Sequence, residues 1–129
     1  MNGRISLDTN IVIRLFKNDP IIVKKLTSLT AICLTVPVVA ELLYGAENSA
    51  RKEENLRNYN KFIDECDILP LTRKTAEQYS KIRMRLKQSG NPIPENDLWV
   101  AAACIENQIS LISEDKHFDF IEDLTIRKW

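Results

Sequence analysis

The sequence is poor in the side chains that build soft-metal and redox sites. His117 is the only histidine, and the three cysteines, Cys33, Cys66 and Cys104, show no metal-binding spacing. Zinc sites are normally built from cysteine and histidine, so these counts argue against one. Each cysteine lies in or beside an apolar stretch, which favours buried thiols over reactive ones.

Long apolar runs and net charge are also missing. No apolar run reaches ten residues, so no segment is predicted to span a membrane. The first residues lack the basic and apolar stretches of an export signal, which makes the cytoplasm the expected location. Lys and Arg number 18, and so do Asp and Glu, so the formal net charge is zero, which argues against broad coating of nucleic acid. With 44% hydrophobic and 28% charged residues, residues 1–129 are predicted to form a single domain.

Short apolar segments alternate with helical patterns along the chain. Strands are predicted at residues 5–7, 31–36, 67–69, 108–112 and 124–126. The helix beginning near Asp19 is expected to bury Ile22, Leu26 and Leu29, and the helix capped by Thr72 to bury Ala76, Tyr79, Ile82 and Leu86. Strands joined by helices imply parallel crossovers, so the prediction is an α/β fold, a three-layer α/β/α sandwich with a mainly parallel central sheet.

Four carboxylates abut or interrupt these apolar segments: Asp8, Glu41, Asp97 and Asp115. Asp8 and Asp115 each follow a predicted strand, whereas Glu41 and Asp97 lie near the starts of predicted helices, where free N–H groups favour negative charge. Sites in parallel sheets form at the carboxyl ends of the strands, so all four acids are expected at one edge. A carboxylate among apolar residues costs several kcal/mol unless it is paired, protonated or metal-bound.

Clustered carboxylates are the usual ligands of Mg²⁺, and Mn²⁺ prefers the same oxygen atoms. The chemistry that most needs such a cluster is phosphodiester hydrolysis by a metal-activated water. Each acid also has a simpler interpretation. Asp8 and Asp97 can serve as helix-start residues, Glu41 can form a structural salt bridge, and Asp115 can be a turn residue.

Other polar residues are candidates for supporting roles. Thr9 and Asn10 could bond to Asp8, and Ser113 to a ligating carboxylate, although capping and turn formation explain the same residues. Residues 73–87 contain six basic residues but only one acid, Glu77. We interpret the basic residues as phosphate contacts or as a solvated helix face. These possible RNA-contacting residues are Arg73, Lys74, Lys81, Arg83, Arg85 and Lys87.

Four blocks carry a resemblance to a known family. They are LDTN at residues 7–10, AELLYG at 40–45, IPENDLWVAA at 93–102 and LISEDKHF at 111–118. In order and spacing the blocks resemble those of PIN-domain toxins of the VapC type, the ribonuclease half of bacterial type II toxin–antitoxin pairs. The match runs nearly end to end, and four blocks in order are far more specific than any one of them.

The resemblance implies Mg²⁺ or Mn²⁺ held by Asp8, Glu41, Asp97 and Asp115, and endonucleolytic cleavage of RNA in the cytoplasm. It also implies homodimers and a small cognate antitoxin that inhibits the toxin. Glu114 adjoins Asp115, and either could be the fourth acid, with Asp115 preferred. Ser113 stands where the family more often has threonine and keeps the hydroxyl. Candidate partner contacts are Phe16, Leu43 and Tyr44.

Two other functions fit parts of the sequence. A PIN-like module that binds without cutting would normally lack one of the acids, yet each is present here. A phosphoacceptor domain would explain Asp8 after a strand, but a phosphatase of that kind needs an aspartate where Asn10 stands, and Glu41 would have no role. We interpret His117 as a packing or hydrogen-bonding residue rather than a general base, and Trp99 and Phe118 as core or interface residues rather than platforms for base stacking.

Overall fold

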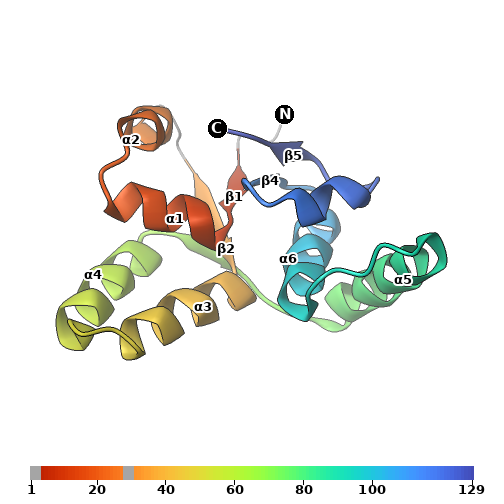
Figure 1. Cartoon of the computed structure of the whole chain (residues 1–129), viewed down its shortest axis with the longest axis horizontal. Coiled ribbons are helices and arrows are strands. Elements are labelled where there is room, and N and C mark those ends of the chain that lie inside the picture. Colours follow the sequence, from red (N-terminus) through yellow and green to blue (C-terminus); the bar gives the residue numbers. More distant parts are fainter. Residues whose placement is uncertain (1–3, 28–30) are drawn as a thin grey trace.

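The computed structural model describes residues 4–27 and 31–129, and within them five strands form one sheet (Figure 1). The sheet order is β3-β2-β1-β4-β5, and every neighbouring pair is parallel. The strands are β1 (Ile5–Leu7), β2 (Ile32–Thr35), β3 (Asp67–Leu69), β4 (Ser110–Ile112) and β5 (Ile126–Arg127). Leu7 at the end of β1 lies opposite Ile112 at the end of β4, so these two strands end side by side.

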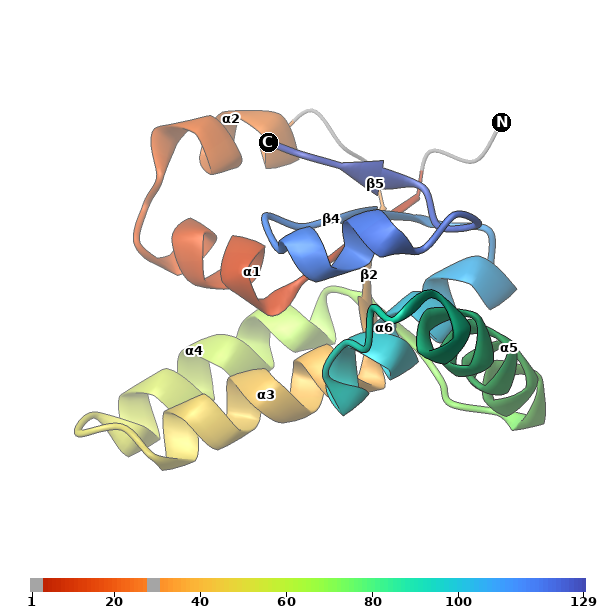
Figure 2. The same cartoon turned by 45° about the vertical axis from the view of Figure 1, so that its right-hand side comes forward.

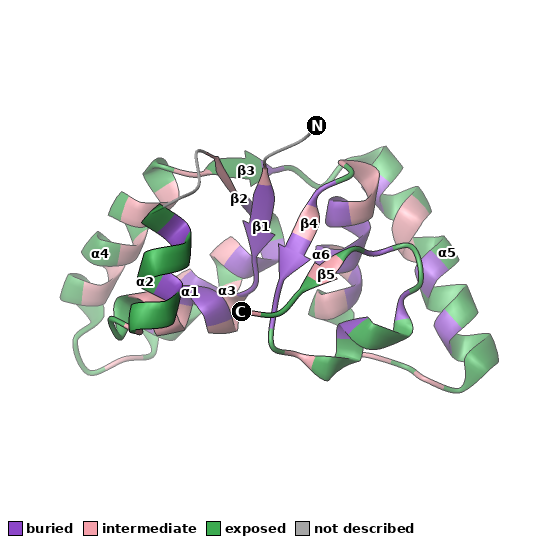
Figure 3. Cartoon of the chain, turned by 90° about the horizontal axis from the view of Figure 1, so that it is seen from above, coloured by how far each residue is buried: buried purple, intermediate pink, exposed green. Residues whose placement is uncertain are grey.

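Helices cover both faces of this sheet. They are α1 (Thr9–Phe16), α2 (Pro20–Thr27), α3 (Val36–Glu47), α4 (Lys52–Asp64), α5 (Arg73–Ser89) and α6 (Glu95–Glu106), with a short 3₁₀ helix η1 (Lys116–Phe120). Figure 3 shows α1 to α4 on one side of the sheet and α5 and α6 on the other. From β1 the chain adds β2 and then β3 on one side of β1, and it later adds β4 and β5 on the other side. Because crossovers between parallel strands are right-handed, the helices that connect strands in these two directions lie on opposite faces of the sheet. The predicted three-layer α/β/α sandwich is confirmed.

The central strands are buried on both faces, as parallel strands between helical layers must be (Figure 3). Leu7, Leu34, Leu111 and Ile112 are fully buried. The strand predicted at 31–36 is shorter because Val36 starts α3, with Pro37 in its first turn. The last strand begins at Ile126 rather than at residue 124.

The predicted core face of α5 is wrong at one position. Ala76 is exposed, and Thr75 is buried in its place, together with Ile82 and Leu86. A buried threonine needs partners, and Thr75 Oγ1 both accepts from Thr72 N at 2.8 Å and donates to the carboxylate of Glu106 on α6. The helices α5 and α6 lie side by side in Figures 1 and 2.

Aromatic residues pack as predicted. Trp99 stacks on Tyr79 across the α5–α6 contact with ring centroids 4.2 Å apart, and Phe118 is fully buried. Leu29, expected on the core face of α2, lies outside the described residues.

The cysteines also agree with the sequence interpretation. Cys33 and Cys104 are buried and Cys66 is partly buried, with no disulfide among the described residues. Burial raises the pKa of Cys66 and of Cys104 to about 12, so both stay protonated near neutral pH. Within the described residues, no helix has the length and apolar character needed to cross a membrane.

Candidate active site

Asp8 is fixed at the junction of β1, β4 and α1. Its backbone N–H donates to the carbonyl of Ile112 at 2.9 Å, which continues the β1–β4 pairing by one residue. The carboxylate caps α1 by accepting from Thr9 N at 2.9 Å, and its other oxygen accepts from Ser113 Oγ at 2.7 Å. Asp8 is only 7% exposed. The capping interpretation of Asp8 is therefore correct but incomplete, because the hydroxyl of Ser113, just after the neighbouring strand β4, donates to the second carboxylate oxygen.

Glu41 lies in α3, about one turn from its start, and is held by polar donors. Thr9 Oγ1 donates to Oε2 at 2.8 Å, and Asn96 Nδ2 donates to Oε1 at 3.1 Å. Among the described residues no salt bridge to Glu41 is formed, so the structural salt bridge considered from sequence is not found there. Since Thr9 adjoins Asp8 and Asn96 adjoins Asp97, these two donors tie Glu41 to the neighbours of two other acids.

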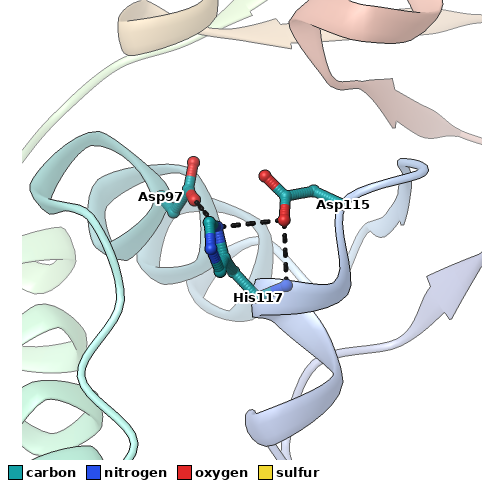
Figure 4. A group of neighbouring side chains, drawn as sticks. All are labelled: Asp97, Asp115 and His117. Atoms are coloured by element: carbon teal, nitrogen blue, oxygen red, sulfur yellow. Dashed lines mark hydrogen bonds and ion pairs between the residues drawn. The ribbon is translucent and has the colours of Figure 1, made fainter.

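Asp97, Asp115 and His117 form the tightest group of the site (Figure 4). His117 Nδ1 lies 3.0 Å from Asp97 Oδ2 and 2.9 Å from Asp115 Oδ1. One potential ligand atom from each residue lies within 4.8 Å of the other two. Asp97 comes from the first turn of α6, whereas Asp115 caps η1 by accepting from His117 N at 2.9 Å. Sequence reasoning treated His117 only as a hydrogen-bonding residue, without placing it between two of the acids.

Glu114 and Asp115 make different contacts. Glu114 forms an ion pair with Arg14 of α1. Asp115 turns toward Asp97, and its backbone N–H donates to Ser113 Oγ at 3.0 Å. Ser113 is completely buried, so one hydroxyl joins the Asp8 carboxylate to the backbone of Asp115.

Burial, with a smaller contribution from neighbouring negative charges, raises the pKa of Asp8 and Asp97. Burial raises the pKa of Asp97 to about 6, and the negative charges of Asp115 and Asp8 add to the rise. Burial also raises the pKa of Asp8, against the lowering effect of the Ser113 and Thr9 hydrogen bonds and with further repulsion from Glu41 and Asp115. The hydrogen bond to Asp97 raises the pKa of His117. The charges of Glu41 and Asp115 thus act on Asp8, and those of Asp8 and Asp115 act on Asp97.

The donor set fits a hard divalent cation. Within the described residues, the group whose potential ligand atoms converge contains two of the four acids, Asp97 and Asp115, together with His117. Carboxylate oxygens suit Mg²⁺ and Mn²⁺, and the imidazole of His117 is the one nitrogen donor in this group of three. A bound cation would offset the cost of ionising Asp97, whose pKa is raised first by burial and then by the charges of Asp115 and Asp8.

The remaining supporting residues lie close to the acids but not all as expected. The Thr9 side chain bonds to Glu41 rather than to Asp8, which contacts only the Thr9 backbone. Asn10 Oδ1 is buried and accepts no hydrogen bond from the described residues. The role of Asn96 was missed from sequence, although Asn96 lies beside Asp97 in the block at residues 93–102.

The six basic residues of α5 do not form one strip. At about 100° per residue, Lys74, Lys81 and Arg85 share one flank of the helix, and Arg83 and Lys87 share the other. Arg83 donates to Tyr79 Oη at 2.8 Å and lies 3.9 Å from Glu95 at the start of α6. The flank that carries Arg83 and Lys87 is thus the one beside the segment that presents Asp97.

Similarity to known proteins shows the family to which the chain belongs. Residues 5–124 match the PIN domain. The chain is 33% identical to Ribonuclease VapC1 of Haemophilus influenzae, over 95% of this chain and 96% of that relative. The chain belongs to the VapC family of PIN-domain proteins. This VapC-family chain is also 28% identical to the tRNA(fMet)-specific endonuclease VapC of Shigella flexneri, over 98% of each.

A solved structure supports the same relationship. VapBC2 from Rickettsia felis, bound to a DNA fragment from its promoter, superposes on this VapC-family chain with a TM-score of 0.90, at 28% identity and 98% coverage of both chains. The resemblance found in the four sequence blocks is confirmed.

Proposed function

We propose that this VapC-family protein is a metal-dependent endoribonuclease, the toxin of a type II toxin–antitoxin pair, acting in the cytoplasm as a single PIN domain over residues 1–129. The observation that supports the proposal is the set of contacts around the acids: Ser113 bonds to the Asp8 carboxylate and to the Asp115 backbone, His117 lies between Asp97 and Asp115, and Thr9 and Asn96 bond to Glu41. Family membership agrees with it, since relatives bear the names ribonuclease and tRNA(fMet)-specific endonuclease.

In this proposal Asp8, Glu41, Asp97 and Asp115 bind Mg²⁺ or Mn²⁺. When bound, a divalent cation lowers the pKa of a water and offsets negative charge on the reacting phosphate. The protein's own contribution is orientation. Ser113 holds Asp8, and the side chains of Thr9 and Asn96 hold Glu41, which is the role that hydrogen bonds behind metal ligands usually have.

The substrate is proposed to be RNA, held near the acids by basic side chains. Arg83 and Lys87 are the candidates nearest the start of α6. Arg73, Lys74, Lys81 and Arg85 remain weaker candidates because most of them lie on other parts of the helix. Phosphate contacts of this kind position the strand without reading its sequence.

We also propose a small antitoxin partner and a homodimer. The relative from Rickettsia felis was solved as VapBC2 with its promoter DNA, which supports a partner protein here. The best surface candidate is Tyr44 of α3, whose side chain is 71% exposed although it is large and aromatic. Phe16 is also exposed, whereas Leu43 is partly buried.

Expression in bacteria tests the toxin and nuclease assignments together. The wild type is expected to arrest growth and to accumulate cleaved RNA, and Asp8→Asn and Asp97→Asn are expected to do neither at equal protein levels. Asp119→Asn is the matched control, because this exposed acid of η1 pairs with Lys128 rather than with the site. Arrest that persists in Asp8→Asn would contradict the proposal.

A further inference from the structure

Arg14 makes a contact that links α1 to the loop carrying the fourth acid. Its guanidinium pairs with Glu114, and Nε donates to Asp19 Oδ2 at 2.9 Å. The same group reaches the carbonyl of Trp129 at 3.5 Å. Arg14 and Glu114 are 100 residues apart in sequence, so no local preference brings them together.

The guanidinium is held firmly enough to act as an anchor. The Arg14 side chain is 23% exposed, and Asp19 lies in the turn between α1, which carries Arg14, and α2. The hydrogen bond from Arg14 to Asp19 raises the pKa of Arg14 and fixes one edge of the planar group. A guanidinium has several donors in a rigid fork, so the remaining edge is free to hold Glu114.

Holding Glu114 determines where Asp115 points. Side chains of successive residues in extended backbone project in opposite directions, and Asp115 has φ −75° and ψ 126°. With Glu114 drawn to Arg14, Asp115 is directed toward Asp97 and His117 (Figure 4). On the inner side the same segment is held by Ser113, which accepts from Asp115 N. The loop is thus fixed from both sides.

We propose that Arg14 is a positioning residue for the metal centre. By holding Glu114 outward it keeps Asp115 in the ligand position and prevents the neighbouring carboxylate from taking its place. The inference rests on the proposed function, because it treats Asp115 as a metal ligand.

The charge of Arg14 and its positioning role predict opposite changes in cation affinity when Arg14 is replaced. Arg14 is a cation close to the acid cluster, so removing its charge should strengthen cation binding if charge were its only influence. Loss of positioning should weaken binding instead. The sign of the change in Mn²⁺ affinity therefore separates the two explanations.

The experiment is a Mn²⁺ titration of the purified protein, followed by electron paramagnetic resonance of free Mn²⁺, with thermal unfolding in parallel. Arg14→Met is expected to weaken Mn²⁺ binding roughly tenfold, the loss typical when support behind a ligand is removed. Lys52→Met is the matched control, since it removes a cation that pairs with Glu47 rather than with an acid of the site or with Glu114. It is expected to leave Mn²⁺ affinity unchanged.

Arg14→Lys supplies a second test should Arg14→Met fold poorly. It keeps the charge but lacks the fork, so positioning predicts weaker Mn²⁺ binding and charge alone predicts no change. Unchanged or tighter binding in Arg14→Met, or unchanged binding in Arg14→Lys, would overturn the inference while leaving the nuclease proposal standing. A wild type that binds no Mn²⁺ would overturn both.

Discussion

The hydroxyl of Ser113 offers the sharpest test of how the acids are arranged. It donates to Asp8 Oδ2 at 2.7 Å and accepts from Asp115 N at 3.0 Å, in a completely buried position. Ser113→Ala removes both contacts and adds no new group. Among the described contacts, the Asp8 carboxylate then keeps only the hydrogen bond from Thr9 N, and the N–H of Asp115 loses its acceptor.

The size of the effect follows from the charge on Asp8. A hydrogen bond to an ionised group contributes about 1.5–3 kcal/mol. Losing a hydrogen bond to the ionised form favours the protonated form, so the already raised pKa of Asp8 should rise further. A proton then competes better with the cation, and a loss of about 10- to 100-fold in metal affinity is expected.

Isothermal titration calorimetry with Mn²⁺ at neutral pH measures this loss. Ser113→Thr is the control, because it keeps the hydroxyl that Ser113→Ala removes. We expect weak binding in the alanine variant and near wild-type binding in the threonine variant. If the alanine and wild-type proteins bind Mn²⁺ equally well, the hydroxyl does not hold Asp8 for a metal, and the reasoning is refuted.

Three further predictions concern stability, pH and RNA. Glu106→Gln weakens the contact with buried Thr75 and should lower the free energy of unfolding by about 1–2 kcal/mol in urea, with Mn²⁺ affinity unchanged. Burial raises the pKa of Asp97 from 3.8 to about 6. Without metal, the stability that the folded protein gains from protonated Asp97 is therefore fully present below pH 3.8 and is lost as the pH rises through 6. The unfolding temperature of the wild type minus that of Asp97→Asn should therefore fall between those pH values, and a constant difference would exclude this linkage. Lys87→Ala should weaken RNA binding and reduce its salt dependence by about one phosphate contact, whereas Lys81→Ala on the other flank should not; equal losses in a filter-binding assay would contradict this.

The sequence predicted most of the helices and strands, and it predicted that Asp8 and Asp115 follow neighbouring strand ends. Apolar runs of strand length alternating with helical periodicity predicted the parallel sheet, because such strands must be buried on both faces. The carboxyl ends of neighbouring parallel strands necessarily meet, so Asp8 after β1 and Asp115 after β4 could be expected together.

Contacts between distant side chains could not be predicted in this way. The outward turn of Glu114 depends on Arg14, which lies 100 residues earlier in the chain. The burial of Thr75 in place of Ala76 depends on Glu106, a carboxylate on the neighbouring helix. Both outcomes follow from a polar partner supplied by another element, and hydrophobic periodicity carries no signal for such a partner.

The measurement that tests the central claim most directly is cleavage of total bacterial RNA by the purified protein with Mg²⁺ or Mn²⁺. Parallel reactions contain EDTA or the Asp8→Asn variant. The account predicts discrete RNA products that disappear in both parallel reactions. Cleavage that persists in EDTA and in Asp8→Asn would show that the acid cluster is not the active site, and would contradict the account.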